Sequence, residues 1–209
     1  MKKIFSLIIL SFFTLGAFAQ FEGTIEFKKK TAFDTIHYVY YIKGDKVRID
    51  EVNGKTGKVE GTFLVDLKAA TMISLSHERK MYLEQKPPAP TKPAGETKAE
   101  KTKATKTILG AKCTEYKVTN TTENTIVTYW LSSGKYTFFS KMLNVLNRKD
   151  KFSTYFQQIK GVEGTFPFLA TMSALDGKVT ESMEVTKVEK KAIDAGKFAI
   201  PAGYTKFDK

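Results

Sequence analysis

The chain has 209 residues, 42% of them hydrophobic and 27% charged, with a formal net charge of +12 and one cysteine, Cys113. This length and composition suit an ordinary hydrophobic core in one domain and exclude a wholly disordered protein. A single cysteine excludes an internal disulfide, so the core alone must stabilise the fold.

Residues 1–19 have the pattern of a secretory signal peptide. Two lysines precede an apolar run that ends at Phe13, and an A-x-A cleavage pattern occupies 17–19. The run is too short for a membrane span, and small residues follow it. We expect cleavage before Gln20, which leaves a periplasmic or secreted protein. No cysteine stands at the cleavage site, so no lipid anchor is expected there.

Alternating apolar and polar residues predict β-strands along most of the remaining chain. Ile25 and Phe27 alternate with charged residues, and Asp176-Gly177 is a strong hairpin signal. Because these strands follow one another through short turns, we expect an antiparallel meander and a mainly β fold. The predicted strands are 23–29, 36–43, 46–52, 58–67, 70–76, 80–85, 113–120, 124–132, 169–175 and 178–191.

Residues 86–106 separate two halves of this pattern. The segment contains six lysines, two glutamates and four of the six prolines, and its apolar residues are all alanine. Such a composition buries too little apolar surface to offset its ordering entropy, so it predicts a disordered loop. The first half is too small to close a core alone. We therefore expect a single domain over 20–209, built as one sheet from both halves, with the loop exposed at its edge.

Residues 138–161 are spaced like helix instead of strand. One group of apolar residues at intervals of three and four is Phe139, Met142, Leu143 and Leu146, and a second is Phe152, Tyr155, Phe156 and Ile159. On one straight helix the two groups would face more than about 90° apart. The pattern predicts two short helices, or one broken helix, with a bend at 147–151. Together they would cover the apolar, concave face of the sheet.

No catalytic, metal-binding or cofactor-binding constellation is recognisable in the sequence. His37 and His77 are the only histidines, and neither has further ligands at the spacing of a zinc site. The "GKT" at 54–56 lacks the first glycine and the following helix of a phosphate-binding loop. We expect no metal, no cofactor and no enzymatic activity. Arginines are few and lysines are scattered singly, so no nucleic-acid partner is expected either.

The helical segment and the aromatic strands together suggest a hydrophobic binding site. The sharper interpretation is a cavity between the curved sheet and the helices that takes an acyl chain. The plainer interpretation is a filled core, since aromatic residues dominate most cores. The candidate ligand-binding residues are Phe139, Met142, Leu143, Leu146, Phe152, Phe156, Tyr38, Tyr40 and Trp130.

Four segments resemble the signature of a known family. They are "YIKGDKVRID" (41–50), "ILGAKCTEY" (108–116), "VTKVEKK" (185–191) and "FAIPAGYTKFD" (198–208). They are similar to a group of secreted bacterial proteins classed as a domain of unknown function, which resembles the periplasmic lipoprotein carriers LolA and LolB in plan. The resemblance implies an open, strongly curved antiparallel sheet, an unclosed half-barrel, with short helices covering its concave face. In the carriers that hollow holds acyl chains.

Two functions follow as hypotheses. The first is a non-catalytic periplasmic protein that binds or carries a lipid or acyl chain beneath a helical cap. The second is an envelope interaction module with a filled core, whose basic segment 86–106 contacts an anionic partner such as a membrane surface. The biological role, the ligand and the oligomeric state stay open.

Overall fold

The computed structural model describes residues 20–207, so the predicted signal peptide lies outside the described residues. One unclosed sheet of 12 strands, almost wholly antiparallel, dominates the fold, which confirms the mainly β prediction. Its strands are β1 (Gly23–Lys30), β2 (Thr35–Lys43), β3 (Lys46–Val52), β4 (Val59–Asp66), β5 (Thr71–Ser76), β6 (Met81–Gln85), β7 (Lys98–Ile108), β8 (Ala111–Asn120), β9 (Thr125–Ser133), β10 (Thr165–Ser173), β11 (Val179–Lys190) and β12 (Thr205–Lys206).

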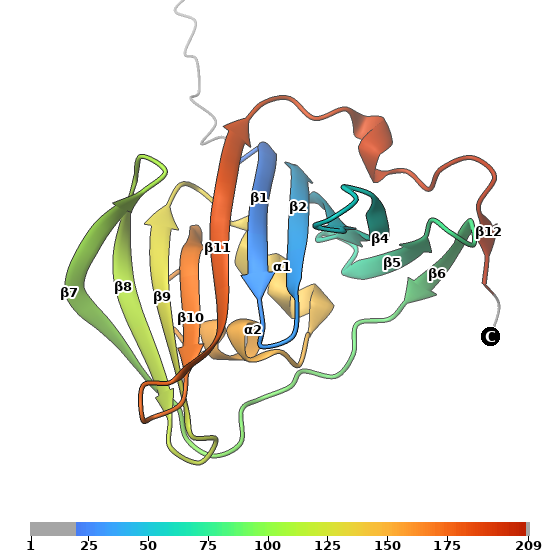
Figure 1. Ribbon diagram of the computed structural model, residues 1–209. Coiled ribbons are helices and arrows are strands. Elements are labelled where there is room, and N and C mark those ends of the chain that lie inside the picture. The colour runs from blue at the N-terminus through green and yellow to red at the C-terminus, as the bar shows by residue number, and fades with distance from the viewer. Residues whose placement is uncertain (1–19, 208–209) are drawn as a thin grey trace, which may run out of the picture.

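The sheet consists of two meanders joined at its centre. Its strand order is β12-β6-β5-β4-β3-β2-β1-β11-β10-β9-β8-β7, so the first strand pairs with the eleventh. Gly23 of β1 lies opposite Lys190 of β11, across almost the whole chain. The short β12 pairs with β6 and is the one parallel neighbour among these strands. Both halves of the chain therefore build one sheet, as Figure 1 shows.

The prediction of a disordered loop over 86–106 is wrong for its second half. Residues 98–106 belong to β7, which pairs with β8 along the outer edge of the sheet. Composition misleads here because an edge strand needs backbone partners and one neighbouring strand, not a buried apolar face. Its exposed lysines are typical of an edge protected against pairing with other chains.

The rest of this segment, residues 86–97, connects two strands that lie far apart. Because β6 and β7 stand near opposite ends of the sheet, the segment crosses the open side below the helices (Figure 1). The side-chain amide of Asn147 donates to the carbonyl of Pro88 over 2.8 Å, and that of Asn120 donates to the carbonyl of Ala94, also over 2.8 Å. We call residues 86–97 the strap. It is not the edge loop that the sequence predicted.

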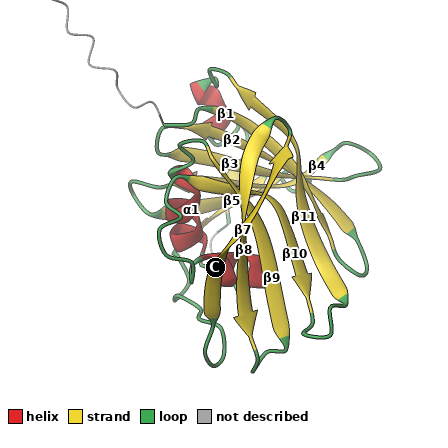
Figure 2. Ribbon diagram, turned by 90° about the vertical axis from the view of Figure 1, so that its left-hand side faces the viewer, coloured by secondary structure: helices red, strands yellow, loops and turns green. Residues whose placement is uncertain are grey.

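Two short helices lie inside the curve of the sheet (Figure 2). They are α1 (Phe138–Leu146) and α2 (Lys151–Phe156), with the predicted bend between them. Asn147 ends α1 in the left-handed conformation, which asparagine tolerates better than most residues. Asp150 begins α2 by accepting from the backbone N–H of Ser153. We call α1, α2 and their connection the cap.

Aromatic rings join the cap to the sheet. Phe139 of α1 packs edge-on against Phe166 of β10 at 4.7 Å between ring centroids, and against Phe156 of α2 at 4.9 Å. All three rings belong to one continuous buried cluster. The amphipathic face of the cap therefore forms the main core of the protein together with the concave face of the sheet.

Candidate functional site

A small cavity lies where the cap meets the concave face of the sheet. Its volume is about 70 Å³, and we call it the cap cavity. Most of its lining is apolar, with a few polar groups on one side. The lining residues are Phe27, Lys29, Tyr38, Tyr40, Tyr129, Phe139, Leu143, Leu146, Arg148, Asp150, Phe152, Ser153, Pro167 and Met183.

Six of the nine residues chosen from sequence line this cavity: Tyr38, Tyr40, Phe139, Leu143, Leu146 and Phe152. Met142 and Phe156 are buried in the core beside it but do not line it. Trp130 does not line the cavity either. Its neighbours Tyr129 and Leu131 are buried toward the cap, so the two-residue period of the strand turns Trp130 to the other face. There Lys106 Nζ lies 4.1 Å from the centre of its ring.

The sequence reasoning missed the polar side of the cavity. Arg148 lies in the connection that the sequence predicted as a bend, and Lys29 is the residue before the last of β1. A signal was present for Lys29, because it continues the inward alternation of Ile25 and Phe27. Nothing local marked Arg148, since its direction depends on the left-handed turn at Asn147.

Arg148 reaches back from this turn over the inner face of the sheet. Its guanidinium lies 5.3 Å from the ring centre of Phe63. Among the residues that the structure describes, no carboxylate forms a salt bridge with it. Asp150 is nearby, but its two oxygens accept from the backbone N–H and the hydroxyl of Ser153, at 3.2 and 2.8 Å. Arg148 is therefore a partly buried cation whose contacts are aromatic.

Lys29 is the second cation of the cavity. Its Nζ lies 5.5 Å from the ring centre of Phe152 and 3.4 Å from Glu181 Oε2. The charge of Lys29 is thus partly balanced by a direct ion pair. Burial opposes the charge of Arg148, but Tyr40, Tyr38, Asp150 and Glu51 favour it and raise the pKa of this guanidinium. Burial raises the pKa of Tyr38 to about 12, so this phenol stays neutral at physiological pH.

Two sets of hydrogen bonds fasten α2 to the sheet. The buried hydroxyl of Tyr129 donates to the carbonyl of Phe152 over 2.8 Å, and burial raises its pKa well above the ordinary value. Glu123 accepts from the Tyr155 hydroxyl at 2.7 Å and pairs with Lys151 at 3.2 Å. These contacts hold the cap in place without any covalent link.

Glu123 also joins the cap to the strap. Its other carboxylate oxygen accepts from the backbone N–H of Ala94 at 2.7 Å. The Tyr155 hydroxyl, followed by this N–H, lowers the pKa of Glu123 below its ordinary 4.5. The turn between β8 and β9 is therefore the point at which cap, strap and sheet meet.

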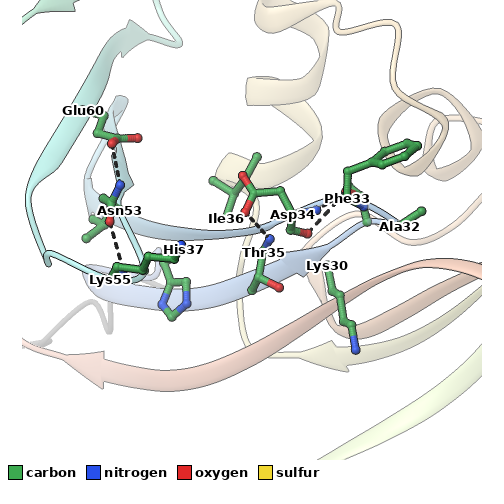
Figure 3. A pocket seen from close by; sticks show the side chains of 13 residues that line it. Lys30, Ala32, Phe33, Asp34, Thr35, Ile36, His37, Asn53, Lys55 and Glu60 are labelled. Atoms are coloured by element: carbon green, nitrogen blue, oxygen red, sulfur yellow. Dashed lines mark hydrogen bonds between the residues drawn. The ribbon is translucent and has the colours of Figure 1, made fainter.

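A larger and more open hollow lies outside the cap, between the ends of two hairpins. It has a volume of about 730 Å³ and lies between the β1–β2 turn and the β3–β4 turn (Figure 3). Its polar groups are mostly engaged within their own turns. Asn53 donates to Glu60 over 2.7 Å, and Asp34 accepts from the backbone of Thr35 over 2.7 Å. We find no convergent reactive groups around this hollow.

Within residues 20–207, no group of three or more His, Cys, Asp or Glu side chains is arranged to hold a metal ion. Over the same residues, no helix has the length and apolarity needed to cross a bilayer. Cys113 is buried.

A search against models of protein families matches residues 21–204 to a domain of unknown function, DUF4412. The chain belongs to this family. No curated protein matches the sequence of this DUF4412 protein.

Several solved structures align with this DUF4412 chain over most of its length. An uncharacterized conserved protein from Thermus thermophilus aligns with a TM-score of 0.55 at 5% identity, over 88% of each chain. A putative outer membrane lipoprotein-sorting protein domain from Vibrio parahaemolyticus aligns with a TM-score of 0.36 at 11% identity, over 84% of this chain and 87% of that one. A DUF1329 family protein from Desulfovibrio piger aligns with a TM-score of 0.39 at 11% identity, over 87% of this chain and 90% of that one.

Two of the segments that carried the sequence resemblance meet on the outer face of this DUF4412 fold. In "GDKVRID", Asp50 accepts from Arg48 at 2.8 Å and from the Thr62 hydroxyl at 2.6 Å. Thr62 in turn contacts His77 at 2.8 Å, and His77 contacts the hydroxyl of Tyr204 in "IPAGY" at 2.7 Å. The network anchors the C-terminal segment onto β3 and β4.

Proposed function

We propose that this protein is a non-catalytic, exported binding protein that takes up a lipid or acyl chain beneath the cap. The observation that carries the proposal is the cap cavity, which is lined by aromatic and aliphatic side chains from both the cap and the sheet. Cavities with a mostly apolar lining and a few polar groups are typical of small-molecule sites. The signal-peptide pattern of residues 1–19 supports action outside the cytoplasm.

The cavity is too small for an acyl chain in the conformation described. Ligand pockets usually measure about 300–1,000 Å³, whereas the cap cavity has about 70 Å³. Uptake therefore requires the cap to move away from the sheet. A core that stays closed is the competing explanation.

The test is lipid mass spectrometry of the protein purified from its native host, together with uptake of a fluorescent fatty acid. We expect a co-purified lipid or saturable uptake. Met183→Gln places an amide in the cavity lining and should weaken uptake about tenfold or more, because the amide loses hydrogen bonds to water. Val179→Gln, on the exposed part of the same strand, is the matched control. An empty protein without uptake would refute the proposal.

A second candidate function is contact with an anionic membrane surface. The observation that favours it is the row of exposed lysines on the edge strand β7: Lys98, Lys101 and Lys103. Binding to anionic liposomes at low salt, lost after all three are changed to glutamine, would support it. Absence of binding in the intact protein at low salt would rule it out.

A further inference from the structure

The polar side of the cap cavity points to the class of ligand. This inference rests on the proposed function and extends it from apolar chains in general to one kind of headgroup. The cavity has an apolar floor formed by residues such as Phe27, Leu143 and Met183, and its polar groups include Arg148. A ligand that matches both the apolar floor and the polar groups would have an aliphatic chain and a charged end.

Arg148 decides the sign of that charge. A guanidinium is always protonated in a protein and carries five donors in one plane. Removing it partly from water is unfavourable unless an anion compensates it. In the described part of the chain no carboxylate does so through a direct salt bridge: Asp150 caps α2 and Glu181 pairs with Lys29, while Asp150 and Glu51 act on Arg148 only at longer range. Its remaining contacts, with the Phe63 ring and the neutral phenol of Tyr38, supply no anionic partner.

We propose that the cap cavity binds aliphatic monocarboxylates, with the chain beneath the cap and the carboxylate on Arg148. A carboxylate matches the planar fork of arginine with two parallel hydrogen bonds. Arg148 and Lys29 are balanced in number by Asp150 and Glu181, so the preference for a carboxylate comes from the guanidinium, which no salt bridge within the described residues engages.

The location of Arg148 also links recognition to uptake. It belongs to the connection between α1 and α2, which must move with the cap. A carboxylate that reaches Arg148 therefore contacts the moving element itself, while the chain replaces the contacts that the cap makes with the sheet. The carboxylate is thus bound by the same element whose movement is required for uptake.

The test compares three probes of equal chain length in calorimetric titrations with the purified protein at neutral pH: laurate, dodecanol and dodecyltrimethylammonium. We expect laurate to bind about tenfold tighter than dodecanol or more, since a charge-assisted hydrogen bond is stronger than a neutral one. The cation should bind most weakly. Arg148→Gln should reduce the affinity for laurate to that for dodecanol. It should change the affinity for dodecanol by no more than about twofold.

Two further variants keep the result interpretable. Lys149→Gln removes the same charge from an exposed neighbour and should leave laurate binding within about twofold at physiological salt. Arg148→Lys keeps the charge but not the fork and should retain part of the preference. Equal affinity for laurate and dodecanol, or equal losses from Arg148→Gln and Lys149→Gln, would overturn the headgroup assignment alone. Failure to bind any of the three probes would overturn the proposed function as well.

Discussion

The hydrogen bond between Tyr129 and Phe152 offers the sharpest test of a movable cap. Tyr129→Phe removes a buried hydroxyl that donates to the α2 backbone over 2.8 Å and changes little else in volume. A buried hydrogen bond of this kind contributes about 0.5–1.5 kcal/mol net, and leaving a buried acceptor without its partner costs about 1–3 kcal/mol. We therefore expect α2 to be held less tightly by about 1–2 kcal/mol.

This change should affect ligand affinity in the opposite direction from stability. If a chain binds only to the open state, a cap that opens more easily raises the population that can bind. A shift of about 1.4 kcal/mol corresponds to a tenfold change in that population. The apparent affinity for laurate should then improve roughly five- to thirtyfold, while the free energy of unfolding falls by the amount given above.

The assay is a titration of a fluorescent fatty acid combined with urea unfolding of the same samples. Tyr116→Phe is the control, because Tyr116 lies opposite Tyr129 on β8 and its ring packs beneath Lys101. That variant should change neither quantity beyond about 0.5 kcal/mol, as is usual away from a buried hydrogen bond. If Tyr129→Phe lowers stability and leaves the affinity for the fatty acid unchanged or weaker, movement of the cap does not control uptake.

Three other predictions concern the core, the cap anchor and the C-terminal segment. Phe139→Ala should lower the unfolding free energy by about 3–5 kcal/mol, and saturating laurate should recover part of the lost Tm by filling the space. The pKa of Glu123 is lowered mainly by Tyr155, so its stabilising effect is complete above pH 4.5 and disappears as the pH falls through the lowered pKa. The stability difference between wild type and Glu123→Gln, measured by urea unfolding, should vanish in acid; a constant difference would contradict this origin. Tyr204→Phe should increase amide exchange in residues 193–207 without changing laurate affinity, because the bond to His77 lies on the outer face.

Much of the architecture could be read from local periodicity. The alternation around Ile25 and Phe27 predicted a strand, and the three- and four-residue spacing from Phe139 to Ile159 predicted two short helices with a bend. These patterns can be recognised from the sequence because the residues that share one face of a strand or helix are close together along the chain. Six of the nine chosen site residues line the cavity, and four of them come from the cap, where the helical spacing groups the apolar residues on one face.

The sequence determined the mainly β class and the existence of an apolar cap, because both follow from spacings of two to four residues. Only the tertiary structure decided that residues 86–97 cross the open side and that Arg148 enters the cavity. Each of these depends on where distant segments meet, above all on the pairing of β1 with β11. Such pairings are selected by the free energy of the whole fold, and no window of the chain contains both partners.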